Sequence, residues 1–128
     1  MNQKILIIED NDQNMYLITF LLRSQGFDVI QAKDGPSGIE IAKEIKPALI
    51  LLDIQLPGMD GYNVAKILRE DSELRSINIV AVTSYAMLGD REHAFEAGCS
   101  GYIEKPINPE TFIEQISEFL PGSISEGG

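Results

Sequence analysis

The stretch Ala48-Leu49-Ile50-Leu51-Leu52-Asp53 decides the fold of this 128-residue chain. Five consecutive apolar residues run directly into one carboxylate, and a loop containing Pro57-Gly58 follows. An apolar run of this length is typical of a strand buried on both faces, as in a parallel sheet. The sequence therefore places Asp53 where a buried strand leaves the sheet. In open α/β sheets this edge is where ligands bind.

Four further segments share this pattern of a short apolar run that ends in polar residues. The predicted strands are residues 4–8, 27–32, 77–82 and 100–104. Amphipathic segments predicted as helices lie between the strands and after the last one. Five βα units in series imply an α/β fold with helices on both faces of one sheet. We expect a doubly wound (βα)5 five-stranded parallel sheet in the flavodoxin-like order 2-1-3-4-5.

The helices are predicted from apolar spacing and capping signals. Asp12 is the expected N-cap of the first helix, and the last helix is expected to start at Asn108-Pro109. Residues 71–76 read as a polar connection, and residues 86–97 as a weakly amphipathic helix in which His93 is solvated and has no role. The second helix is expected to bury one apolar face, formed by Ile41, Ala42 and Ile45.

Composition limits the possible functions. The length fits one domain, predicted over residues 1–121 with a frayed tail at 122–128. The net charge of −10 argues against nucleic-acid binding, which needs a basic patch. No apolar run approaches the roughly 20 residues of a membrane span, and no secretory leader is evident. Cys99, the single cysteine, is interpreted as a small buried residue, which fits a cytoplasmic location.

The residues at the predicted strand ends form a constellation. In the expected strand order, four of the five strands are neighbours, so their polar ends should meet at one edge of the sheet. Three carboxylates in one crevice repel each other and call for a cation, and an all-oxygen ligand set suits Mg²⁺. The residues are Glu9 and Asp10 after the first strand, Asp53 after the third, Thr83 and Ser84 after the fourth, and Lys105 after the fifth.

With a metal present, Asp53 could accept a phosphoryl group. A carboxylate can act as a nucleophile toward phosphorus and form an aspartyl-phosphate. Lys105 would then offer a positive charge to one phosphoryl oxygen, and Thr83 a hydroxyl to another. Each residue alone has a plainer structural reading: a loop acid, a helix cap or a surface lysine. The combination is what favours phosphoryl chemistry.

These residues resemble the receiver domain of two-component response regulators. The resemblance covers residues 4–120 and is strongest to single-domain receivers of the DivK type. It is carried by Glu9-Asp10-Asn11, Asp53, Pro57, Met59-Asp60-Gly61-Tyr62, Thr83, Ala86-Met87-Leu88-Gly89-Asp90-Arg91 and Lys105-Pro106.

The resemblance implies a role for each matching position. It implies that Asp53 accepts a phosphoryl group from a histidine of a kinase or phosphotransfer protein. Mg²⁺ would be bound by Glu9, Asp10, Asp53 and the backbone carbonyl of Gln55. Thr83 and Lys105 would contact the phosphoryl group, and the switch pair would be Thr83 and Tyr102. The Lys105-Pro106 bond would be cis, and Gln55 and Tyr85 would tune the phosphate lifetime.

The implied protein is a signalling switch, not an enzyme. A histidine kinase or histidine phosphotransferase would be its donor, and a downstream target would dock on the face formed by the fourth helix, fifth strand and fifth helix. A monomer or weak dimer is expected. We favour a free-standing protein, with a receiver excised from a hybrid histidine kinase as the alternative.

Three other interpretations fit the residues less well. An FMN-binding flavodoxin would not place two acids after the first strand, because they repel phosphate. A Mg²⁺-dependent phosphohydrolase of the haloacid dehalogenase kind would need an acid at Gln55 for proton transfer. A degenerate receiver that binds partners without phosphate would not need the full set of acids, hydroxyl and lysine.

Overall fold

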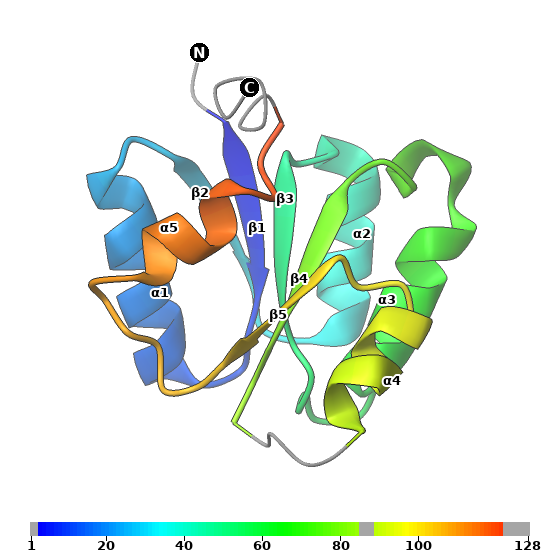
Figure 1. The fold of residues 1–128 in the computed structure, drawn as a ribbon. Helices are drawn as coiled ribbons and strands as arrows, with labels where there is room; N and C mark the ends of the chain where they lie inside the picture. The colour runs from blue at the N-terminus through cyan, green and yellow to red at the C-terminus, as the bar shows by residue number, and fades with distance from the viewer. Residues whose placement is uncertain (1–2, 85–88, 122–128) are drawn as a thin grey trace.

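The computed structural model describes residues 3–84 and 89–121, and one five-stranded parallel sheet lies at its centre (Figure 1). The strand order is β2-β1-β3-β4-β5, which confirms the predicted topology. Because β3 is the central strand, its last residue lies at the centre of the carboxyl edge of the sheet. The strands are β1 (Lys4–Ile8), β2 (Asp28–Ala32), β3 (Leu49–Asp53), β4 (Asn78–Thr83) and β5 (Gly101–Glu104).

Five α-helices in the described residues cover the two faces of the sheet (Figure 1). One face carries α1 (Asp12–Ser24) and α5 (Phe112–Ser117). The other carries α2 (Gly35–Ile45), α3 (Gly61–Glu70) and α4 (Asp90–Glu96). A short 3₁₀ turn, η1 (Ser72–Leu74), follows α3. The result is the three-layer arrangement expected of a doubly wound fold.

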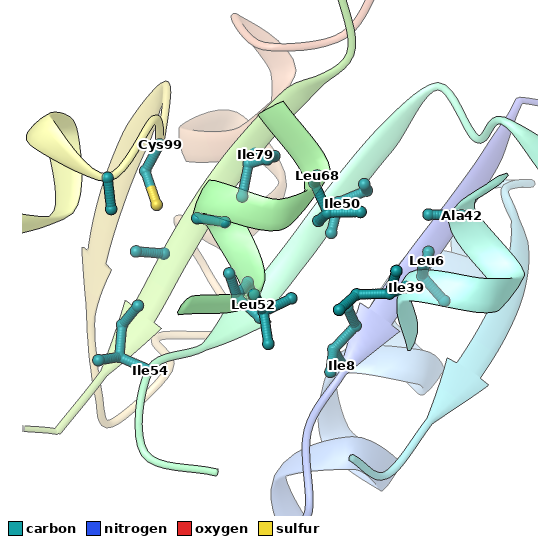
Figure 2. Close-up of a cluster of buried hydrophobic side chains, with 14 of the residues drawn as sticks. Leu6, Ile8, Ile39, Ala42, Ile50, Leu52, Ile54, Leu68, Ile79 and Cys99 are labelled. Carbon is teal, nitrogen blue, oxygen red and sulfur yellow. The ribbon is translucent and has the colours of Figure 1, made fainter. Parts of the chain in front are cut away.

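Strand β3 divides the apolar side chains into two cores. Its residues are all buried, and successive side chains point to opposite faces. Leu49 and Leu51 therefore pack with α1 and α5, whereas Ile50 and Leu52 pack with α2, α3 and α4 (Figure 2). Full burial of one such side chain stabilises the fold by about 1.5–3 kcal/mol. The two cores thus fix the position of β3, and with it the position of Asp53.

Cys99 lies in the core beneath α2, α3 and α4 (Figure 2). Its side chain is buried, and burial raises the pKa of the thiol to about 11. This agrees with its interpretation as a small core residue.

The first helix begins one residue earlier than predicted, and a different side chain caps it. Asn11, not Asp12, is the N-cap, and its Oδ1 accepts a hydrogen bond of 2.9 Å from the Asn14 N–H. Asp12 is the first residue of α1 and forms an exposed ion pair of 2.6 Å with Lys33. The prediction was wrong by one residue because Asn and Asp are equally good caps.

The buried face of α2 also differs from the prediction. Ile39 and Ala42 are buried, whereas Ile41 and Ile45 are only partly buried. The cause is Gly38, at which an added Cβ would lie 2.5 Å from the Ile8 Cδ1 atom. Because α2 approaches β1 closely at this glycine, the helix face that contains Gly38, Ile39 and Ala42 is the buried one. A search for apolar side chains alone does not predict that a glycine is buried.

Other boundaries also differ from those predicted: β2 and β5 each begin one residue later, and β4 spans 78–83 rather than 77–82. The connection over residues 71–76 contains η1, which buries Leu74. Helix α5 begins at Phe112, because the Asn108 side chain accepts from the Glu110 N–H and holds residues 109–111 in turns. Helix α4 begins at Asp90, and the predicted helical residues 86–88 and the predicted tail at 122–128 lie outside the described residues.

Candidate functional site

The predicted site residues meet at the carboxyl edge of the sheet. Glu9 and Asp10 directly follow β1, Asp53 ends β3, and Lys105 directly follows β5. One carboxylate oxygen from each of the three acids lies within 4.8 Å of the other two. They line a cleft of about 580 Å³ that is formed by Glu9, Asp10, Asn11, Asn14, Asp53, Gln55, Ser84, Lys105 and Pro106. The sequence therefore placed the acidic cluster correctly.

Lys105 is the counter-charge of the two buried acids. Glu9 is 1% exposed and Asp53 is 3% exposed, whereas Asp10 is exposed. The Lys105 Nζ lies 3.0 Å from Glu9 Oε1 and 3.5 Å from Asp53 Oδ2. Backbone N–H groups also donate to these two carboxylates: that of Gln55 to Asp53 Oδ1 at 2.9 Å, and that of Asn11 to Glu9 Oε2 at 3.1 Å. One ammonium group thus faces two buried carboxylates, which leaves excess negative charge.

The excess negative charge helps to raise the pKa of Glu9. Burial, and then the neighbouring charge of Asp53, raise the pKa of Glu9 to about 7, although the hydrogen bond from Lys105 acts in the opposite direction. A carboxylate whose ionised form is unfavourable is a carboxylate that a cation would stabilise. Three carboxylates with no soft ligand suit a hard divalent ion such as Mg²⁺.

We expect the metal-free protein to become more stable as the pH falls from about 8 to 5. Glu9 has a higher pKa in the folded chain than its ordinary value of 4.5, so the folded state binds the extra proton in this window. This stability is lost as the pH rises through 7. Each pKa unit is worth about 1.4 kcal/mol, so the gain in stability is at most about 3 kcal/mol. Urea unfolding in EDTA at several pH values measures it.

The matched control for this pH series is Glu9→Gln, which keeps the shape of the side chain and removes its titration. The variant should lose the rise in stability below pH 7. If wild type and variant gave parallel curves, Glu9 would not be the group responsible.

Thr83 and Tyr102 lie on neighbouring strands. Thr83 is buried at the end of β4, and its carbonyl accepts from the Lys105 N–H at 2.8 Å. Tyr102 is half-buried on β5, and the Arg91 guanidinium of α4 lies 5.8 Å from the centre of its ring. The Lys105-Pro106 bond is cis, as the resemblance implied. Tyr85 lies outside the described residues.

Gly61 brings the start of α3 against the end of β3. Its N–H donates to the Ile54 carbonyl at 2.8 Å. A Cβ at this position would lie 2.5 Å from the Ile54 Cα and 2.6 Å from the Asp53 carbonyl oxygen. Only a glycine allows this approach, so the loop after Asp53 is held down by the backbone itself.

Two side-chain contacts between segments far apart in sequence were not predicted. The Ser84 Oγ donates to Gln55 Oε1 at 2.8 Å. The Tyr62 ring stacks on the His93 ring, with centroids 3.8 Å apart, although His93 is exposed as expected. Both contacts join segments about 30 residues apart, and no local sequence signal indicates them.

The strand order and the acids, hydroxyl and lysine at its edge define a CheY-like domain. The chain belongs to the family of the response regulator receiver domain, whose family model matches residues 5–117. It is 43% identical over 120 residues to the polar-differentiation response regulator DivK of Brucella anthropi, covering 94% of this chain and 98% of that protein. Receiver domains are signal transducers of two-component systems and are typically not enzymes.

Solved receiver structures share the fold. The receiver domain of sensor histidine kinase PA1611 from Pseudomonas aeruginosa is 33% identical, with a TM-score of 0.86 over 93% of this chain and 98% of that one. That structure contains a magnesium ion coordinated in its active-site cleft. A CheY-like receiver from Methanospirillum hungatei is 28% identical, with a TM-score of 0.88 over 99% and 100% of the two chains. Among the described residues of this chain, no helix is long and apolar enough to span a membrane.

Proposed function

We propose that this chain is a response regulator of a two-component phosphorelay in the cytoplasm, and that Asp53 is its phosphoacceptor. The observation that carries this proposal is the position of the Asp53 carboxylate. It is buried at the cleft, grouped with the carboxylates of Glu9 and Asp10, and 3.5 Å from the Lys105 ammonium. A nucleophile, the ligands for a cation and a fixed positive charge are the parts that phosphoryl transfer requires.

The reaction would move one phosphoryl group between two proteins. An Asp53 oxygen attacks phosphorus, the P–N bond to the donor histidine breaks, and the imidazole leaves with the bonding electron pair and takes up a proton. Lys105 holds one phosphoryl oxygen by charge, and the Thr83 hydroxyl donates to another. Glu9, Asp10, Asp53 and the Gln55 carbonyl would hold Mg²⁺, which neutralises charge on the phosphoryl oxygens.

Phosphorylation would act as a switch through Thr83 and Tyr102. A phosphoryl group adds roughly 1.5–2 negative charges, which attract the Thr83 hydroxyl, and the ring of Tyr102 turns into the space left behind. Tyr102 borders a groove between α4, β5 and α5, which also includes Arg91, Ile103 and Gln115. A change in this ring therefore alters the surface on which a downstream target docks.

The test is phosphorylation by a small-molecule donor. We expect wild type to gain the mass of one phosphoryl group when incubated with acetyl phosphate and Mg²⁺, and Asp53→Asn to gain none, as read by intact mass. The isosteric change keeps the shape of the site and removes the nucleophile. Asp60→Asn is the matched control, because Asp60 lies in the same loop but caps α3, and it should be phosphorylated like wild type.

Two results would contradict the proposal. One is a wild type that stays unmodified under these conditions. The other is an Asp53→Asn protein that is modified as fast as wild type.

A further inference from the structure

Ser84 and Gln55 join two loops at the mouth of the cleft. Gln55 follows β3, Ser84 follows β4, and both line the cleft with Asp53. The Ser84 hydroxyl donates to Gln55 Oε1 at 2.8 Å across 29 residues of sequence. Nothing in the local sequence of either loop predicts this hydrogen bond.

This hydrogen bond closes a ring of contacts around the phosphoacceptor. Asp53 Oδ1 accepts from the Gln55 N–H at 2.9 Å, and Gln55 Oε1 accepts from Ser84. The preceding carbonyl, that of Thr83, accepts from the Lys105 N–H at 2.8 Å, and the Lys105 ammonium returns to Asp53 Oδ2 at 3.5 Å. The ring of contacts therefore starts and ends at the Asp53 carboxylate.

The links of this ring differ in strength. The Lys105 and Asp53 side chains are 10% and 3% exposed, so their ion pair is sheltered. The Thr83 to Lys105 link joins the backbone at the end of β4 to the backbone of the residue after β5. The Ser84 to Gln55 hydrogen bond joins two side chains at the surface. It is consequently the link that opens most easily.

We propose that Ser84 is a positioning residue that acts through Gln55 to keep water away from phosphorylated Asp53. The inference rests on the proposed phosphoacceptor function. In the loss reaction, a water oxygen attacks phosphorus and the bond from phosphorus to the Asp53 oxygen breaks. The carboxylate leaves with the electron pair, and the proton of water passes to the released phosphate or to solvent. The Ser84 hydroxyl holds the Gln55 amide against the β4 loop, and so narrows the path by which that water arrives.

The experiment measures the lifetime of the phosphorylated protein. Wild type, Ser84→Ala, Ser84→Thr, Gln55→Ala and the Ser84→Ala/Gln55→Ala double variant are phosphorylated with acetyl phosphate and Mg²⁺. The donor is then removed, and decay is followed by intact mass. Ser84→Ala should shorten the lifetime about 2- to 10-fold, the effect of one hydrogen bond. Ser84→Thr keeps a hydroxyl and should stay within about twofold of wild type.

The double variant separates positioning from a general loosening of the cleft. If the two side chains act as one pair, its decay should be no faster than that of the faster single variant. Multiplied single effects would overturn the proposal, as would a Ser84→Ala lifetime equal to that of wild type. The thermal midpoint of Ser84→Ala should match wild type, because Ser84 is exposed and its hydroxyl makes this hydrogen bond at the surface.

The outcomes also distinguish this proposal from the one it rests on. If wild type takes up no phosphoryl group, the phosphoacceptor function fails and Ser84 has no lifetime to protect. If all variants are phosphorylated with equal lifetimes, only the role of Ser84 fails.

Discussion

Lys105→Met is expected to slow phosphoryl uptake from acetyl phosphate by about 100- to 1,000-fold, the usual loss when one preorganised donor is removed from a reacting oxygen. Among the described residues that line the cleft, Lys105 is the one cation. Its side chain is 10% exposed and its ammonium already faces Asp53, so its charge acts with little screening by water. The measurement is the initial rate of mass gain at fixed Mg²⁺ and donor concentrations.

Lys46→Met is the matched control for this prediction. Lys46 pairs with Glu73 at 3.0 Å, but its side chain is 48% exposed and lies outside the cleft. An exposed pair contributes about 0–1 kcal/mol, so this variant should be phosphorylated at the wild-type rate. A Lys105→Met rate within threefold of wild type would mean that the ammonium does not assist transfer.

The second large effect concerns stability: Arg69→Met should lower the free energy of unfolding by about 3 kcal/mol. The Arg69 guanidinium of α3 donates to the carbonyls of Leu74 and Ile77 and to that of Gly98, at distances of 3.2, 2.7 and 2.7 Å. It also donates to the Arg75 carbonyl and the Ser100 hydroxyl, each at 3.2 Å. Methionine fills similar space but removes the guanidinium donors from all five acceptors, of which the Leu74 carbonyl and the Ser100 hydroxyl each keep one backbone N–H donor.

Two further variants sharpen this test. Arg69→Lys should recover only part of the loss, because an ammonium is a point charge and cannot reach acceptors in several directions at once. Arg75→Met is the control, since Arg75 is exposed and the hydrogen bond from its side chain to the Arg69 carbonyl is long at 3.4 Å. Urea unfolding of all three against wild type is the measurement. A loss below 1 kcal/mol for Arg69→Met would show that water replaces the guanidinium.

The sheet and the acidic cluster were predictable because their signals are local. The apolar run from Leu49 to Leu52 specifies a buried strand, and the residue after a strand lies at the sheet edge whatever the rest of the chain does. Once the strand order is known, Glu9, Asp53 and Lys105 must meet. The prediction of a cation site then follows from charge repulsion alone.

The contacts that could not be predicted are those between side chains far apart in sequence. A half-buried arginine such as Arg69 reads as an ordinary helix residue, and no periodicity reveals which carbonyls it reaches. The hydrogen bond between Ser84 and Gln55 depends on the relative positions of the loops that follow β3 and β4. The shift from Asp12 to Asn11 at the start of α1 reflects two adjacent residues with the same capping chemistry, between which only the backbone geometry decides.

The burial of Cys99 makes the protein suited to site-specific labelling. Thiol reagents such as maleimides react with the thiolate, and a thiol with a pKa of about 11 is almost fully protonated at neutral pH. A cysteine introduced at the exposed Glu92 of α4 would therefore carry a fluorescent dye while the native thiol stays unlabelled. Such a probe would report on the environment of this helix in an otherwise natural sequence.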